Sequence, residues 1–198
     1  TMRAGVLVLG ALLARYRKAK VSLPGGCSIG SRPIDLHLKA LKKMGAKIKV
    51  KNGYVVASAK KGLKGCLIKF PKISVGATEN ILIAACFSKG KTKLRNCACE
   101  PEIQDLIYFL KKLGCTINQV GKRSIDIEGV KKLKPATHKV IFDRIEAGTY
   151  IIAAALTKGK VKIINIDPKI MLTEINLLNK MGIKIKKRKN YIIVTSTK

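Results

Sequence analysis

The residues best suited to chemistry lie in one loop near the N-terminus, between Pro24 and Pro33. Cys27 follows two consecutive glycines, which predicts a mobile and exposed thiol. A free thiol has a pKa of about 8.5, which positive neighbours lower, so it can exchange a proton or attack an electrophile near neutral pH. Arg32 precedes a predicted helix, where its guanidinium and the helix N-terminus both favour an anion. A thiol beside an anion site points to chemistry on a small phosphorylated acid.

The same residue types also have ordinary structural explanations. Cys27 fits an incidental surface thiol about as well as a reactive one. Arg32 fits a solvated residue at a helix start, and Asp35 and His37 fit ordinary residues of the first turn. Because a single Gly-Gly-Cys string is weak evidence, the loop has to be compared with its counterparts elsewhere in the chain.

The chain repeats one unit three times, so the loop has two counterparts further along the sequence. The segment Leu-Lys-Lys-Met-Gly that ends at Gly45 has counterparts ending at Gly114 and Gly182, 69 and 68 residues further along. Each glycine follows apolar residues spaced i, i+4, i+7 and i+10, which is the pattern of a helix with one buried face. Glycine directly after such a stripe favours a left-handed helix end. These helices are predicted over residues 34–44, 103–113 and 171–181.

The remaining elements repeat with the same period. Alternating apolar residues around turn residues such as Asn52-Gly53 predict hairpins over 47–57, 116–127 and 183–194. A second helix, over 3–14, 75–87 and 145–156, is apolar on nearly all sides, so we expect it to be central and buried. Each of these helices leads into a strand, over 21–23, 92–94 and 161–164. The predicted fold is therefore α/β (α+β), built from β-α-β-β-α units that bury their apolar faces against one another.

The link from strand to helix differs among the three copies. It is short over 164–167, longer over 94–100 and longest over 23–32. Only the longest combines glycines, a cysteine and an arginine. Extra loop length on a repeated scaffold is where function tends to lie.

Composition narrows the classes of function. The formal net charge is +30, but only eight of the 41 basic residues are arginine and the lysines are dispersed, with 5% aromatic residues and no tryptophan. A nucleic-acid-binding protein usually clusters its charge and adds arginine and aromatic residues, so such a module is only an alternative. No apolar run reaches the length of a membrane span. The six cysteines lack the spacing of a zinc site, and we expect no metal, no cofactor and mostly inert thiols in a reducing compartment.

Several motifs together resemble the UDP-N-acetylglucosamine enolpyruvyl transferase family. They are Arg3-Ala-Gly-Val, Leu23-Pro-Gly-Gly-Cys27-Ser-Ile-Gly-Ser-Arg32-Pro33-Ile34-Asp35-Leu36-His37, Lys72-Ile73-Ser74-Val75-Gly76-Ala-Thr-Glu, Glu100-Pro-Glu102 and Asp143-Arg144-Ile-Glu-Ala-Gly148. Their order and spacing cover essentially the whole chain. The resemblance implies inside-out α/β barrel domains of the enolpyruvyl transferase type.

The resemblance also implies a reaction and a set of site residues. Enolpyruvate moves from phosphoenolpyruvate to the 3-hydroxyl of UDP-N-acetylglucosamine with release of phosphate, the first committed step of peptidoglycan synthesis in the cytoplasm. Cys27 matches the general acid, which also forms an adduct with phosphoenolpyruvate. The residues that match substrate contacts are Arg3, Arg32, Pro33, Ile34, Asp35, Leu36, Lys72, Ile73, Ser74 and Val75. No metal, membrane or nucleic acid is implied.

The resemblance implies that this chain is an incomplete copy. Family members are longer, and the aspartate thought to deprotonate the sugar lies in the half that this chain lacks. We expect residues 1–141 to form most of a first domain and residues 142–198 to begin a second. The missing half is then a required partner, and turnover by this chain alone is doubtful. A UDP-sugar-binding homologue without catalysis is a further alternative.

Overall fold

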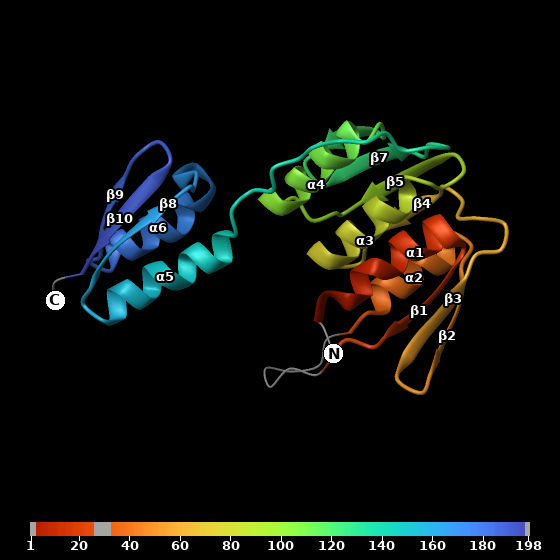
Figure 1. Ribbon diagram of the computed structural model, residues 1–198, viewed down its shortest axis with the longest axis horizontal. Coiled ribbons are helices and arrows are strands. Elements are labelled where there is room, and N and C mark those ends of the chain that lie inside the picture. Colours follow the sequence, from red (N-terminus) through yellow and green to blue (C-terminus); the bar gives the residue numbers. More distant parts are fainter. Residues whose placement is uncertain (1–2, 26–32, 197–198) are drawn as a thin grey trace. The chain divides into compact units, whose positions relative to one another are not determined.

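The protein is described by a computed structural model that covers residues 3–25 and 33–196. The chain divides into two compact units, Thr1–His138 and Lys139–Lys198, and each is described by itself (Figure 1). Unit 1 contains, in order, η1 (Arg3–Leu7), α1 (Val8–Tyr16), β1 (Lys18–Ser22), α2 (Asp35–Lys43), β2 (Lys47–Lys51), β3 (Tyr54–Ser58), β4 (Leu67–Lys69), α3 (Val75–Ala85), β5 (Lys91–Arg95), α4 (Pro101–Lys112), β6 (Thr116–Gly121) and β7 (Ser124–Glu128). Unit 2 contains α5 (Arg144–Leu156), β8 (Lys160–Ile164), η2 (Pro168–Met171), α6 (Leu172–Lys180), β9 (Lys184–Lys187) and β10 (Tyr191–Thr195).

The three predicted repeats are present, and each forms the same antiparallel sheet. The strand orders are β1-β3-β2, β5-β7-β6 and β8-β10-β9, so the last strand of each hairpin is always central. Strand β4 extends the second sheet by pairing in parallel with β5. In the first hairpin, Asn52 and Gly53 have φ angles of 51° and 75°, which is the conformation of a tight type I′ turn.

The predicted helix ends are also confirmed. Gly45, Gly114 and Gly182 have φ angles of 98°, 100° and 92°, a region that residues with a Cβ rarely adopt. Each glycine lies in the three-residue link between a helix and the first strand of a hairpin, and its φ angle lets the chain turn from helix into sheet over that short link.

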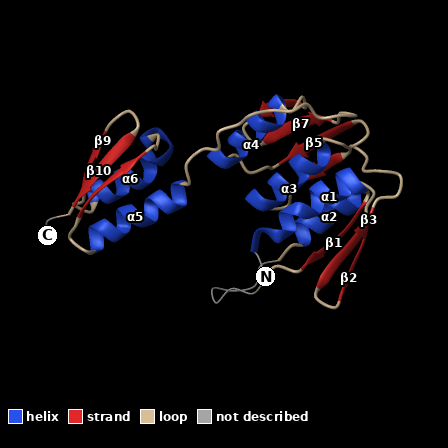
Figure 2. Ribbon diagram, in the orientation of Figure 1, coloured by secondary structure: helices blue, strands red, loops and turns tan. Residues whose placement is uncertain are grey.

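Helix α3 is the centre of unit 1. Figure 2 shows it running between the β1-β3-β2 sheet and the sheet that contains β5 and β7. It packs against α1, α2 and α4, and Ile81 and Leu82 are fully buried. Helices on the inside and sheets on the outside are the arrangement that the family resemblance predicts.

Helix α5, the counterpart of α3, contradicts one expectation. Ala147, Ile151 and Ala154 pack inward, but the exposed fractions of Ile152 and Leu156 are 50% and 80%. The prediction that every such helix is buried is therefore wrong for this one. Helix α3 has helices of two repeats around it, whereas the described part of unit 2 contains a single repeat, which covers only one side of α5.

Candidate functional site

The predicted site residues fall into two groups. Cys27 and Arg32 lie outside the described residues, and Arg3 is described only by its place in the backbone of η1. The predicted contact runs 33–36 and 72–75 are described completely. The geometry of the site therefore comes from these two runs and from the elements that hold them.

The two runs meet at one pocket. It has a volume of about 480 Å³ and is lined by Pro24, by all four residues of run 33–36, by 72–74, and by Ala4, Val6, Leu7, His37 and Gly76. Val75 begins α3 directly beside it, but it does not line the pocket. Residues almost 40 positions apart in the sequence thus share one cavity, and η1, with Arg3 at its start, forms another wall.

The pocket lies where two helices begin. Helix α2 starts at Asp35 and α3 starts at Val75. Ser74 caps α3, because its hydroxyl oxygen accepts a hydrogen bond from the Ala77 amide at 3.2 Å. The cap leaves the amides of Val75 and Gly76, the first two of the helix, without a partner inside it. Two helix N-termini at one cavity favour a negatively charged ligand.

Charged side chains at the pocket have two signs. Lys72 is exposed beside the start of α3 and adds positive charge to the two helix N-termini. Asp35 is partly exposed, and its carboxylate lies 3.4 Å from the ammonium group of Lys39, one turn along α2. Lys72 and the helix amides suit a phosphate, and Asp35 suits the N–H or hydroxyl group of an uncharged ligand part.

His37 is a pocket residue that the sequence predictions left out. Only 7% of the residue is exposed, and its Nδ1 lies 3.0 Å from Nδ2 of Asn80. Burial lowers the pKa of His37, and the nearby Asp35 carboxylate partly opposes that shift. Helical spacing could have found it, because His37 lies three residues after Ile34 and four before Leu41, on the apolar stripe of α2.

The described cysteines behave as structural residues. Burial raises the pKa of Cys97 to about 11 and also raises the pKa of Cys66. The pKa of Cys86 is raised by its hydrogen bond with Cys115 and by burial. Cys86 and Cys115 are core residues, whereas Cys66 is half-buried. A raised thiol pKa disfavours nucleophilic chemistry at Cys66, Cys86 and Cys97.

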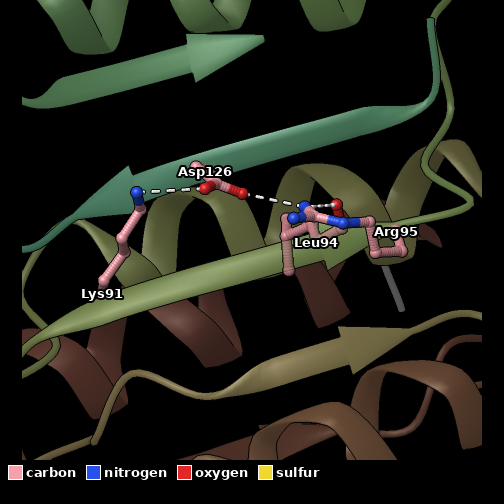
Figure 3. Close-up of polar contacts among 4 residues, drawn as sticks. All are labelled: Lys91, Leu94, Arg95 and Asp126. Atoms are coloured by element: carbon pink, nitrogen blue, oxygen red, sulfur yellow. Dashed lines mark hydrogen bonds and ion pairs between the residues drawn. The ribbon is translucent and has the colours of Figure 1, made fainter. Parts of the chain in front are cut away.

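Two other features have no connection with the predicted residues. A larger hollow of about 1280 Å³ in unit 2 is lined by residues of 139–142, 165–172 and 187–190, and none of the predicted site residues lines it. On β7, the buried Asp126 accepts a hydrogen bond from Arg95 at 2.8 Å and pairs with Lys91 at 3.1 Å (Figure 3). Both basic residues lie on β5, so this cluster joins neighbouring strands and serves the sheet.

The fold and the pocket place this chain in the class of enolpyruvyl transferase folds. The structure of the enolpyruvyl transferase NikO from Streptomyces tendae matches 95% of this chain and 46% of its own, with a TM-score of 0.80 at 23% identity. EPSP synthase from Acinetobacter baumannii matches 98% of this chain and 46% of its own, with a TM-score of 0.68 at 21% identity. At such low identities these likenesses establish the fold.

Sequence comparison establishes the family. The family model described as EPSP synthase (3-phosphoshikimate 1-carboxyvinyltransferase) matches residues 1–198, and the chain belongs to that family. Relatives named UDP-N-acetylglucosamine 1-carboxyvinyltransferase include those of Pelagibacter ubique, 62% identical over 100% of this chain, and Rickettsia prowazekii, 52% identical over 98%. The chain spans about half the length of these relatives, 48% and 46%. The resemblance predicted from the motifs is confirmed, and with it the partial match.

In the part of the chain that the structure describes, no helix is both long enough and apolar enough to cross a membrane.

Proposed function

We propose that this chain belongs to a UDP-N-acetylglucosamine 1-carboxyvinyltransferase, which transfers enolpyruvate from phosphoenolpyruvate to the sugar 3-hydroxyl and releases phosphate. The observation that carries the proposal is the pocket in which runs 33–36 and 72–74 meet at two helix N-termini. The names of relatives up to 62% identical support the choice of substrate. In this proposal the reaction begins peptidoglycan synthesis in the cytoplasm and so serves cell-wall growth and division.

The roles of the residues follow from the chemistry of addition and elimination. The sugar 3-hydroxyl gives its proton to a base in the other half of the enzyme as its oxygen bonds to C2 of phosphoenolpyruvate, and the Cys27 thiol adds a proton at C3. In the elimination a proton from C3 returns to the Cys27 thiolate, the bond between C2 and the phosphate oxygen breaks, and the leaving phosphate takes up the proton held by the base. In this scheme Lys72, Arg32 and the first amides of α3 hold the phosphates of the substrates, because cationic groups and free N–H groups bind anions.

The other predicted contacts orient the nucleotide sugar. Arg3 is assigned to the substrate cleft through η1, which forms one wall of the pocket. Asp35 and Ser74 offer polar contacts to uracil or sugar, Pro33, Ile34, Leu36 and Ile73 contribute apolar surface, and Val75 contributes its backbone amide at the start of α3. The division of the complete enzyme into a first domain over 1–141 and a second from 142 is part of the proposal. So is the requirement for the other half of the enzyme.

Mass spectrometry tests the role of Cys27. We expect incubation with phosphoenolpyruvate and UDP-N-acetylglucosamine to modify Cys27 in the complete enzyme, and peptide mapping to locate the adduct. The Cys27→Ser variant should show no adduct, and Cys99→Ser should behave like the parent, because Cys99 has no role in the scheme. An adduct on Cys99 in place of Cys27 would contradict the assignment.

Binding and turnover separate the proposal from its alternatives. We expect the 198-residue chain to release no phosphate at the rate of a complete enzyme, because part of the cleft is supplied by the other half. Binding of UDP-N-acetylglucosamine to the complete enzyme without any Cys27 adduct would indicate a non-catalytic homologue. Tight, salt-dependent RNA binding without sugar-nucleotide binding would indicate a nucleic-acid-binding module.

A further inference from the structure

A buried side-chain amide on α3 joins three elements around the pocket. Asn80 is fully buried, and its Oδ1 accepts a hydrogen bond from the backbone N–H of Gly10 at 2.8 Å. Its Nδ2 donates to the backbone carbonyl of Val6 at 2.9 Å. A backbone N–H can only donate and a carbonyl can only accept, so these two bonds fix which end of the amide is oxygen.

The same amide determines the proton position on His37. Nδ2 of Asn80 lies 3.0 Å from Nδ1 of His37. An amide nitrogen only donates, so Nδ1 must accept, and an acceptor nitrogen carries no proton. The imidazole is then neutral, with its single ring proton on Nε2. A doubly protonated ring would place two N–H groups against each other inside the core.

The remaining ring nitrogen is positioned to serve the pocket. His37 lines the cavity, and among the described residues Nε2 has no hydrogen-bond partner. Gly76, another lining residue, leaves space beside the ring, because a Cβ at that position would lie 3.4 Å from Cε1 and 3.7 Å from Nε2 of the imidazole. The free ring edge therefore faces the start of α3, where the unpaired amides lie.

We propose that Asn80 is a positioning residue that holds His37 as a neutral imidazole whose Nε2–H donates to a phosphate oxygen of the bound nucleotide sugar. The identity of the ligand rests on the proposed function, whereas the protonation of the ring does not. A neutral donor costs less to bury than a cation and keeps the same hydrogen-bonding pattern as the pH falls.

The surroundings of the ring agree with a neutral state. The described charged groups that line the cavity are Asp35 on α2 and Lys72 before α3, and the η1 residues that line it are apolar. Asp35 favours the imidazolium, but burial outweighs it and lowers the pKa of His37. Because the folded-state pKa is depressed, the neutral form should persist below the ordinary histidine pKa of about 6.5.

Nitrogen NMR of the chain labelled with ¹⁵N-histidine tests the proton position directly. The chain has two histidines, so a His138→Gln variant assigns the His37 signals. We expect a protonated Nε2 and an unprotonated Nδ1 that stay unchanged from pH 7.5 to about pH 6, below the ordinary pKa of about 6.5. A proton on Nδ1, or titration of the ring with that ordinary pKa, would overturn the proposal without reference to any substrate.

UDP-N-acetylglucosamine tests the second half of the proposal. Addition of the sugar nucleotide should shift the Nε2 signal and leave Nδ1 unprotonated. Binding that leaves Nε2 unmoved would overturn donation to the phosphate by His37. The absence of any binding to the complete enzyme, with the ring proton still on Nε2, would instead overturn the proposed function and the ligand assigned here.

The variant Asn80→Asp separates positioning from packing. The carboxylate can still accept from Gly10 but can no longer donate, so Nδ1 of His37 must carry a proton. We expect the affinity for UDP-N-acetylglucosamine to become dependent on pH. Near pH 8 it should fall about tenfold or more, because a neutral ring with its proton on Nδ1 turns Nε2 into an acceptor facing phosphate. Near pH 6 the imidazolium should restore binding.

Asn190→Asp is the matched control, because it makes the same charge change at an exposed position in unit 2. It should leave the pH dependence of binding unchanged. If Asn80→Asp binds like the parent at both pH values, Asn80 has no positioning role. If the variant does not fold, the ring-proton measurement on the unmodified chain still decides the proposal.

Discussion

At the scale of single residues, the structure separates reactive from structural groups by their surroundings. Asp126 and Asp35 are both carboxylates near basic residues, yet one is buried between strands and the other is partly exposed at a pocket. Cys86 and Cys97 are buried thiols with raised pKa values, so sulfur chemistry is disfavoured there. Residue type alone would not have distinguished these cases, because burial and partners depend on the fold.

Asp126→Asn should lower stability more than Asp35→Asn. We expect a loss of about 1–2 kcal/mol in the free energy of unfolding, because the amide cannot pair ionically with Arg95 and Lys91, which stay partly hydrated. Asp35→Asn removes one exposed pair with Lys39 and should cost less than about 0.5 kcal/mol. Urea unfolding at pH 7 measures both, and equal losses would contradict the structural role of Asp126.

The pH dependence of stability, compared between the parent and Asp126→Asn, provides a second check on the role of Asp126. The hydrogen bond from Arg95 lowers the pKa of Asp126 in the folded state. A depressed folded pKa adds stability above the unfolded pKa of about 3.9, and that stability is lost as the pH falls through the lower folded value. The parent should therefore lose more stability than Asp126→Asn between pH 5 and pH 2. Parallel curves for the two proteins would show that the carboxylate is not stabilised by its partners.

At the scale of elements, the close approach of α1 and α3 depends on a glycine. A Cβ at Gly10 would lie 2.2 Å from Oδ1 and 2.6 Å from the backbone oxygen of Asn80. The helices touch at the residue that also orients His37, so their packing and the pocket share one contact.

Gly10→Ala should therefore destabilise unit 1 by about 3 kcal/mol or more, because the added methyl group overlaps buried backbone that cannot move aside. Gly5→Ala is the control, since a Cβ at Gly5 meets nothing within 4 Å, and it should change stability by less than about 0.5 kcal/mol. Thermal or urea unfolding compares the two. Similar stability of both variants would refute the tight crossing of α1 and α3.

Most elements could be predicted from the sequence because their signals are local. The spacing of apolar residues predicted the helices, and the glycines that follow them predicted where the helices end. The Asn52-Gly53 pair predicted a hairpin turn. Strand β4 was missed, because it has three residues and pairs in parallel with β5, a contact that no local pattern specifies. The contact runs 33–36 and 72–75 were predicted from the family resemblance. The orientation of His37 could not be predicted from the sequence, because it depends on Asn80, 43 residues away.

At the scale of the whole molecule, the two units differ in how much apolar surface they bury. Ile145, Ile152 and Leu156 on α5 are each at least half exposed, although the matching helix α3 is buried. Exposed apolar residues on one helix usually mark a surface that another element covers.

Leu156→Lys in the 198-residue chain should raise solubility and change the free energy of unfolding by less than about 0.5 kcal/mol, because the exposed fraction of Leu156 is already 80%. Ile151→Lys is the contrasting variant, since Ile151 is fully buried on the opposite face of α5 and should unfold unit 2. Turbidity and circular dichroism provide the two measurements. A large stability loss from Leu156→Lys would mean that this end of α5 is packed within the chain.

The placement of the pocket at the starts of α2 and α3 joins two helices that β2, β3 and β4 separate along the chain. A ligand bound there would hold the two helix starts together, so that either start could open only after the ligand leaves. Saturation should consequently slow amide hydrogen exchange along both helices together, with protection of about 2.7 kcal/mol at a hundredfold excess over Kd wherever exchange requires release of the ligand.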